Sequence, residues 1–164
     1  MPVSFANADL RGRDFRGQDL AGADFSGANL MQARFSGVKL SNAVFRGAIL
    51  VECFLDGADL THADFTDANL EFAVLGGADV SGALFTRADL NRCNLVGTRA
   101  HGADFRGANL LYSRPGNADF QGADFREANL DRAIMRRANL SGADLRGAHG
   151  KPNLENAKLD GMLR

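Results

Sequence analysis

Residues 23–30 read Ala-Asp-Phe-Ser-Gly-Ala-Asn-Leu, so that one pattern begins twice within eight residues. The unit is Ala, then Asp or Asn, then Leu or Phe, then two variable residues of which the second is often Gly. Every fifth residue from Phe5 to Gly150 gives thirty positions, of which fifteen are Leu and ten are Phe. Two residues before these positions, Ala occurs twenty-two times. A period that spans nearly the whole chain determines the architecture.

A five-residue period fits neither an α-helix nor a regularly alternating strand. In a helix the Leu and Phe positions would spread over all faces, and the frequent Gly would destabilise it. In a short extended step, however, Ala and the Leu or Phe two residues later point the same way, and the intervening Asp or Asn points outward. The next two residues turn the chain. Gly at the second central position is typical of a type II turn, which needs positive φ there.

A second period of twenty residues sets the number of units in one coil. Identical residues recur at this spacing, with Phe at seven successive positions of one column and Leu at seven of the next. The Phe column is Phe5, Phe25, Phe45, Phe65, Phe85, Phe105 and Phe125. Four units per coil predict a four-sided, all-β solenoid of about eight coils, which forms a single domain over residues 1–164. At ~4.8 Å per coil the rod should be roughly 35–40 Å long.

This repeat resembles the consensus of the pentapeptide-repeat family, and the resemblance covers residues 3 to about 163. It implies a right-handed quadrilateral parallel β-helix whose Leu, Phe and Ala columns fill the interior. It implies little about activity. Members of that family include proteins that protect DNA gyrase and that resemble duplex DNA in size and charge.

The composition excludes several classes of protein. The 19 Lys and Arg residues nearly balance the 20 Asp and Glu residues, which argues against a strongly basic nucleic-acid binder. Two Cys in 164 residues make no disulfide scaffold, and the first residues carry no secretory signal. No apolar run approaches the ~18 residues of a membrane span. We therefore expect a cytoplasmic protein that does not enter the membrane.

A filled rod offers no pocket for catalysis. His62, His101 and His149 fall on separate coils without a shared set of carboxylates. Cys53 and Cys93 share an inward column two coils apart, about 9–10 Å, which exceeds the ~7 Å limit for a disulfide. We interpret them as buried substitutes for Ala. The sequence predicts no catalytic residue, no metal ligand and no cofactor.

The two ends of the repeat differ. Arg13 and Gln18 occupy Ala positions in the first coil, residues 1–20, where we expect them to cap the open end. Near residues 150–152 the repeat loses one residue, so residues 150–164 form an irregular C-terminal cap or a dimerisation segment. Either a second copy of the chain covers this apolar end, making a homodimer, or the segment folds over its own core. The apolar residues concerned are Leu154, Leu159, Met162 and Leu163.

Departures from the repeat indicate candidate contact residues. At the corner after the Leu10 column, only one of seven second turn residues is Gly, so we expect no type II turns there. Pro115 occupies an inward position and lacks a strand donor, which predicts a local bulge. Phe54 and Val74 are apolar at outward positions of successive coils, and Phe72 lies beside Val74. These three residues form a candidate protein-contact surface; alternatively, they only pack against neighbouring parts of the rod.

The charge is distributed unevenly along the chain. Residues 1–82 carry 6 basic and 11 acidic groups, whereas residues 83–164 carry 13 and 9. Because Arg columns such as Arg106, Arg126 and Arg146 are usually solvated, we do not expect direct nucleic-acid binding. The function that fits best is a rigid, non-enzymatic scaffold for protein–protein interaction, whose partner the sequence does not name. The alternative is a DNA mimic that binds DNA gyrase or topoisomerase IV and gives resistance to gyrase-targeting drugs.

Overall fold

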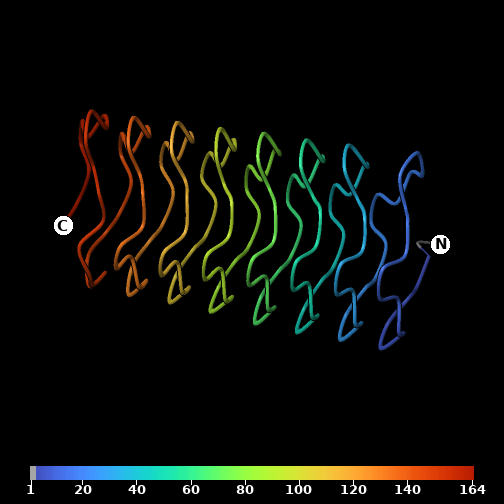
Figure 1. Ribbon diagram of the computed structural model, residues 1–164. Helices are drawn as coiled ribbons and strands as arrows, with labels where there is room; N and C mark the ends of the chain where they lie inside the picture. The colour runs from blue at the N-terminus through green and yellow to red at the C-terminus, as the bar shows by residue number, and fades with distance from the viewer. Residues whose placement is uncertain (1–2) are drawn as a thin grey trace.

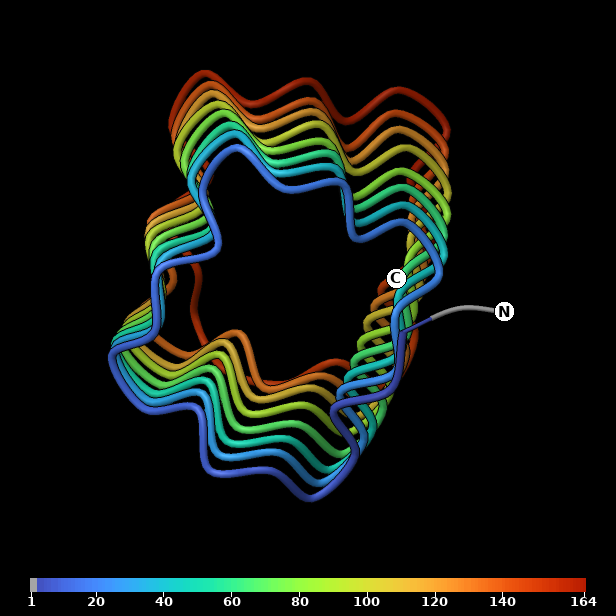
Figure 2. The ribbon, with the colours of Figure 1, turned by 90° about the vertical axis from the view of Figure 1, so that its right-hand side faces the viewer.

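The computed structural model describes residues 3–164 and forms a right-handed quadrilateral β-helix. The coils stack into a straight rod with the two ends of the chain at opposite ends of it (Figure 1). Viewed along the axis, each coil lies over the one before it and has four sides (Figure 2). The fold predicted from the repeat is therefore confirmed. Residues 3–164 contain no helix, and hence none that is long and apolar enough to cross a membrane.

The β structure consists of isolated parallel bridges, without longer strands in the described part of the chain. From the Ser4–Asp24 bridge to the Asn129–His149 bridge, each bridge joins an outward residue to the residue twenty positions later. The Phe25 amide donates to the Val44 carbonyl at 2.7 Å, and the Val44 amide donates to the Ala23 carbonyl at 2.9 Å. This register confirms twenty residues per coil.

The turns use one backbone geometry at all four corners. The Ala33 amide donates to the Leu30 carbonyl at 2.9 Å, which closes a four-residue turn, and Gln32 has a φ of 58°. Positive φ recurs at the same position for Glu52 and Phe72. The prediction that this corner would avoid the type II geometry was therefore wrong. The amide of Gln32 also bonds to Val51 of the next coil at 3.0 Å, so stacking imposes the conformation whatever the side chain.

The core consists of stacked columns of inward side chains. Phe65 is fully buried, and its ring stacks on that of Phe45 with 4.7 Å between the centroids. Cys53 and Cys93 are fully buried free thiols whose Sγ atoms each contact a carbonyl oxygen, at 3.2 Å. This burial confirms that the two cysteines substitute for Ala inside the rod, and it raises the pKa of both thiols.

The repeat is irregular at Pro115 and near residues 150–152, and the structure differs between these two places. Pro115 is buried and interrupts only the bridge between Arg114 and Ile134, while the Ile134 amide still donates to the Ser113 carbonyl at 2.9 Å. The predicted bulge was therefore wrong, because bonds on both sides of the proline hold the register. At the C-terminus, Ile134 bridges Asn153, nineteen residues later. The loss of one residue from the repeat is thus absorbed within a continuing coil.

Candidate functional site

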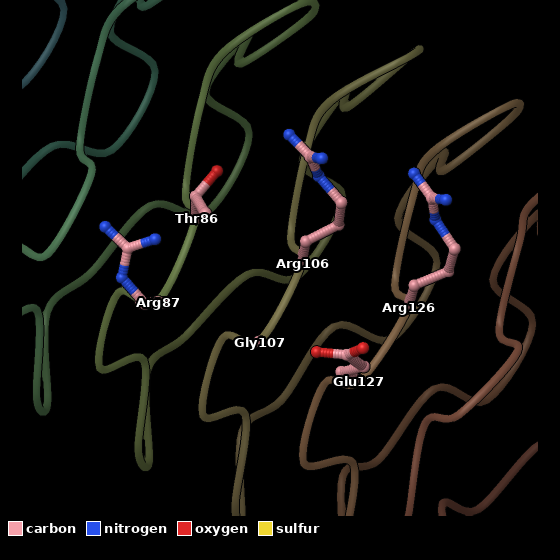
Figure 3. A pocket seen from close by; sticks show the side chains of 6 residues that line it. All are labelled: Thr86, Arg87, Arg106, Gly107, Arg126 and Glu127. Carbon is pink, nitrogen blue, oxygen red and sulfur yellow. The ribbon is translucent and has the colours of Figure 1, made fainter.

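The surface hollows of the rod are shallow. One, of about 420 Å³, lies between successive coils and is lined by Thr86, Arg87, Arg106, Gly107, Arg126 and Glu127 (Figure 3). Among residues 3–164, no three His, Cys, Asp or Glu side chains are grouped so that they could hold a metal ion. His101 and Asp119 do form a pair, with 2.6 Å between Nε2 and Oδ2, but it lies exposed on the surface.

The arginines of this hollow are paired with carboxylates. The Arg126 Nη2 atom lies 2.6 Å from Asp124 Oδ2, and its Nε atom lies 3.8 Å from Asp144 on the next coil. Arg146 pairs in the same way with Asp144, and its hydrogen bond lowers the pKa of that carboxyl to about 2. Figure 3 shows Arg106 and Arg126 extended in parallel. This column is therefore an alternating ladder of charges and not a free basic stripe.

The candidate functional site lies on a different side of the rod. We call it the aromatic–arginine face and define it by two columns of residues. The corner column is Gln32, Glu52, Phe72, Arg92, Tyr112 and Arg132. The outward column, two residues further along each coil, is Arg34, Phe54, Val74, Asn94, Arg114 and Ile134.

The structure brings the three predicted contact residues together on this face. Phe54 bridges Val74 on the next coil, and Phe72 lies two residues before Val74. Phe54 is 41 % exposed and Phe72 42 %, whereas Val74 is half-buried. Tyr112 and Ile134, 40 % and 41 % exposed, extend the apolar surface toward the C-terminus. Large apolar side chains that gather on one side of a soluble fold commonly mark a contact surface.

Aromatic rings and guanidinium groups alternate along the corner column. The Arg92 guanidinium carbon lies 5.5 Å from the centre of the Phe72 ring on one side and 5.5 Å from that of Tyr112 on the other. Arg132 continues the series at 5.3 Å from Tyr112. Such cation–π contacts contribute about 0.5–1 kcal/mol each at exposed sites. The alternation of arginine and aromatic residues is visible once the sequence is written with a period of twenty.

The corner column carries these side chains despite an unfavourable backbone. Among residues 3–164, fifteen non-glycine residues have positive φ, and six of them belong to this column. Five of the other nine are Asn or Asp, the types that enter the left-handed region most readily. None of the six is Asn or Asp. The left-handed conformation costs such residues roughly 1–2 kcal/mol each, so the turn by itself does not favour these side chains.

The two ends of the rod also contrast. At the first coil, the Arg13 guanidinium lies 5.2 Å from the Phe15 ring centre and 5.9 Å from that of Phe5, and Gln18 is exposed. At the last coil, Leu154 and Met162 are partly buried against the core, while Leu159 is 37 % exposed. Leu163 bridges Asp144 and so occupies an outward position, with 49 % of its surface exposed.

A hollow of about 460 Å³ opens at the C-terminal end. Its walls include the side chains of Leu130, Leu145 and Leu154, together with Pro152 and Arg164. The last coil therefore covers the core less completely than the coils within the rod, where inward side chains are fully buried.

A solenoid of four-sided coils with a five-residue period is the architecture of pentapeptide repeats. The family model "Pentapeptide repeats (8 copies)" matches residues 3–37, 39–75, 73–110 and 116–149. The chain belongs to this family.

Comparison with solved structures finds proteins of diverse roles. HetL of the cyanobacterium Nostoc sp. strain PCC 7120, involved in heterocyst differentiation regulation, is 29 % identical over 98 % of this chain and 89 % of its own, with a TM-score of 0.43. Trypsin-treated QnrB1, a plasmid-mediated fluoroquinolone resistance protein, is 23 % identical over 90 % of this chain and 77 % of its own, with a TM-score of 0.54. The second match shows the shared fold. No curated protein sequence matches the chain.

Proposed function

We propose that this protein is a non-enzymatic β-helical scaffold that binds another protein through the aromatic–arginine face. The observation that carries the proposal is the gathering of Phe54, Phe72, Tyr112 and Ile134, each about two-fifths exposed, on one side of the rod. Protein interfaces are enriched in aromatic residues and arginine. A rigid solenoid holds such side chains at fixed spacing, so little ordering is needed on binding.

The test compares two pairs of substitutions that remove similar apolar surface. One variant carries Phe54→Ser and Phe72→Ser on the aromatic–arginine face. The control carries Ile49→Ser and Leu84→Ser, which are 39 % and 38 % exposed in other columns. We expect cross-linked capture from cell extract to recover a partner with the parent protein and the control, and not with the first variant. Equal capture by both variants would refute the proposal.

A second candidate function is DNA mimicry directed at DNA gyrase or topoisomerase IV, and one observation favours it. The N-terminal half is acidic, with 6 basic and 11 acidic groups in residues 1–82. However, several of these carboxylates are paired, as Asp14 is with Arg16 at 2.6 Å and Asp67 with Arg87 at 2.8 Å. A supercoiling assay with and without a quinolone tests this function, since a DNA mimic inhibits gyrase or protects it from the drug.

Dimerisation and location are also proposals. The exposed Leu159 and the hollow beside Leu154 support a homodimer joined at the C-terminal end. Arg13 over the Phe15 ring supports a capping role for residues 1–20. The two free thiols, Cys53 and Cys93, fit the reducing cytoplasm. Because the Arg106 column is neutralised by aspartates, we still do not expect direct nucleic-acid binding.

A further inference from the structure

The guanidinium group of Arg92 lies between two aromatic rings and has no carboxylate partner within residues 3–164. Its guanidinium carbon lies 5.5 Å from the centres of the Phe72 and Tyr112 rings, on the coil before and the coil after. No carboxylate of residues 3–164 lies within 4.0 Å of it. The donors of a guanidinium lie in its plane, so stacking leaves them available to bind a carboxylate with two parallel hydrogen bonds.

Arg114 provides a second guanidinium without a carboxylate partner. It lies two residues after Tyr112, in the outward column of the face, and is exposed. It forms no ion pair within residues 3–164, unlike Arg106, Arg126 and Arg146, which all do. Arg34, Arg92 and Arg114, all on the aromatic–arginine face, form no ion pair within residues 3–164, whereas Arg132 of the same face lies 3.9 Å from Asp131.

We infer that the aromatic–arginine face binds an acidic protein segment that also carries aromatic or aliphatic side chains. The segment lies extended along the rod axis, with its carboxylates on Arg92 and Arg114 and its apolar side chains on Phe54, Phe72 and Val74. This inference rests on the proposed function and adds the chemistry of the partner.

Charge and spacing both support this occupant. The two columns of the face contain four arginines and one carboxylate, Glu52, so the face attracts negative charge. Arg92 and Arg132 are two coils apart in one column, about 10 Å at the usual spacing of paired strands. A chain in the polyproline II conformation covers that distance in about three residues and returns every third side chain to the same face. Carboxylates at every third position therefore match the periodicity of the rod.

The same face disfavours a nucleic acid. Glu52 stands in the corner column, Glu71 precedes Phe72, and Asp131 lies 3.9 Å from Arg132. A phosphate backbone carries charge along its whole length and would be repelled at these positions. The outward residues Phe54, Val74 and Ile134 offer apolar contact and no charge. A peptide can place apolar residues against them, whereas a phosphate backbone cannot.

The test uses a fluorescein-labelled peptide of about twelve residues, long enough at ~3.4 Å per residue to span the rod. It has Glu at every third position and Phe and Ser between. Comparison peptides replace Glu by Lys or Phe by Ser, and single-stranded oligo(dT) represents nucleic acid. One protein variant carries Arg92→Gln and Arg114→Gln. Its control carries Arg126→Gln and Arg146→Gln, which removes the same charge from arginines that are already paired. Melting curves verify that each variant is folded.

We expect the Glu/Phe peptide to bind most tightly, and the first variant to weaken it about tenfold or more, as loss of charged hydrogen bonds does. The control should change the affinity by less than about threefold, because its arginines keep little free charge. Equal loss in both variants, no binding at about 1 mM peptide, or tighter binding of oligo(dT) would each overturn the inference. If partner capture depends on Phe54 and Phe72 but not on Arg92 and Arg114, the proposed function stands and the acidic chemistry is wrong.

Discussion

The rings of Phe65 and Phe85 stack face to face inside the rod, with centroids 4.8 Å apart and planes 2° from parallel. Both side chains are fully buried. The distance matches the spacing between hydrogen-bonded strands, so the backbone hydrogen bonds and the stacked rings favour the same spacing between coils. This confirms the prediction that the two residues are interior neighbours on consecutive coils.

Truncating one ring should open a cavity that neighbouring coils are unable to close. We expect Phe85→Ala to lower the free energy of unfolding by ~3–5 kcal/mol, from lost burial and the cavity together. Denaturant titration followed by circular dichroism measures this. Leu84→Ala, at the adjacent outward position and 38 % exposed, is the matched control and should change stability by less than about 1 kcal/mol. Equal effects of the two substitutions would contradict the assignment of the columns.

The periodic part of the fold could be predicted from sequence because one residue type repeats at each structural position. The columns, the twenty-residue coil and the burial of the cysteines all follow from the residue types found at spacings of five and twenty in the sequence. The turn at the Leu10 corner could not be predicted from residue preference. The Gln32 amide donates to the Val51 carbonyl of the next coil at 3.0 Å, and coil stacking therefore overrides the local preference. Hydrogen bonds between successive coils hold the register beside Pro115 in the same way.

The candidate site was predicted only in part. Outward placement of Phe54, Phe72 and Val74 follows from the frame of the repeat alone. The stacking of Arg92 between Phe72 and Tyr112 depends on side-chain rotamers, which a frame does not specify. The pairing of Asp144 with Arg146 also depends on side-chain rotamers, because the repeat places the two residues near each other but does not specify where their side chains point. The count of charges in residues 83–164 therefore did not indicate that the arginines of the Arg106 column are paired with aspartates.

Acid should destabilise the rod through its paired aspartates. Hydrogen bonds from Arg16 and Arg146 lower the pKa of Asp14 and Asp144, respectively, to about 2. A carboxyl whose pKa is lower in the folded chain stabilises it above the unfolded pKa of ~3.9, and this contribution is lost as the pH falls toward 2. We therefore expect the Tm to fall from about pH 5 to about pH 2.

A single substitution tests this origin of the acid sensitivity. Asp144→Asn should lower the Tm at neutral pH and flatten its decline in acid, because the titrating carboxyl is gone. Asp160→Asn is the control, since Asp160 forms no ion pair within residues 3–164 and is exposed. Thermal melts at a series of pH values measure both. A decline equally steep in Asp144→Asn and the parent protein would show that other groups cause the acid sensitivity.

The predicted contact residues should contribute little to stability. Phe54→Ser and Phe72→Ser remove side chains that are 41 % and 42 % exposed and lie outside the core, so the loss comprises their partly buried surface and the contact of Phe72 with Arg92. We expect this contact to account for about 0.5–1 kcal/mol, with far-ultraviolet circular dichroism unchanged. Unfolding of the double variant would mean that the face is structural and would remove the basis for a docking surface.

Both cysteines should be inert in the folded protein. Cys53 and Cys93 are fully buried, and desolvation by burial raises the pKa of each thiol, so little reactive thiolate forms at neutral pH. We expect a thiol-specific chromogenic reagent to label neither residue in native buffer and both after unfolding in guanidinium chloride. Rapid labelling of the native protein would show that the coils open locally near these residues.

The C-terminal end should join two copies of the chain. A solenoid buries its core only where another layer covers it, and here Leu159 is 37 % exposed while a hollow of about 460 Å³ lies beside Leu154. Two such ends related by a twofold axis would cover each other and give a rod roughly 70–80 Å long. Multi-angle light scattering should report a dimer that becomes monomeric when residues 154–164 are deleted. Because deletion also removes the last coil, Leu159→Asp serves as a second variant, which should dissociate the dimer and leave the circular dichroism spectrum unchanged. A full-length chain that is monomeric at micromolar concentration would show instead that residues 150–164 cover their own core.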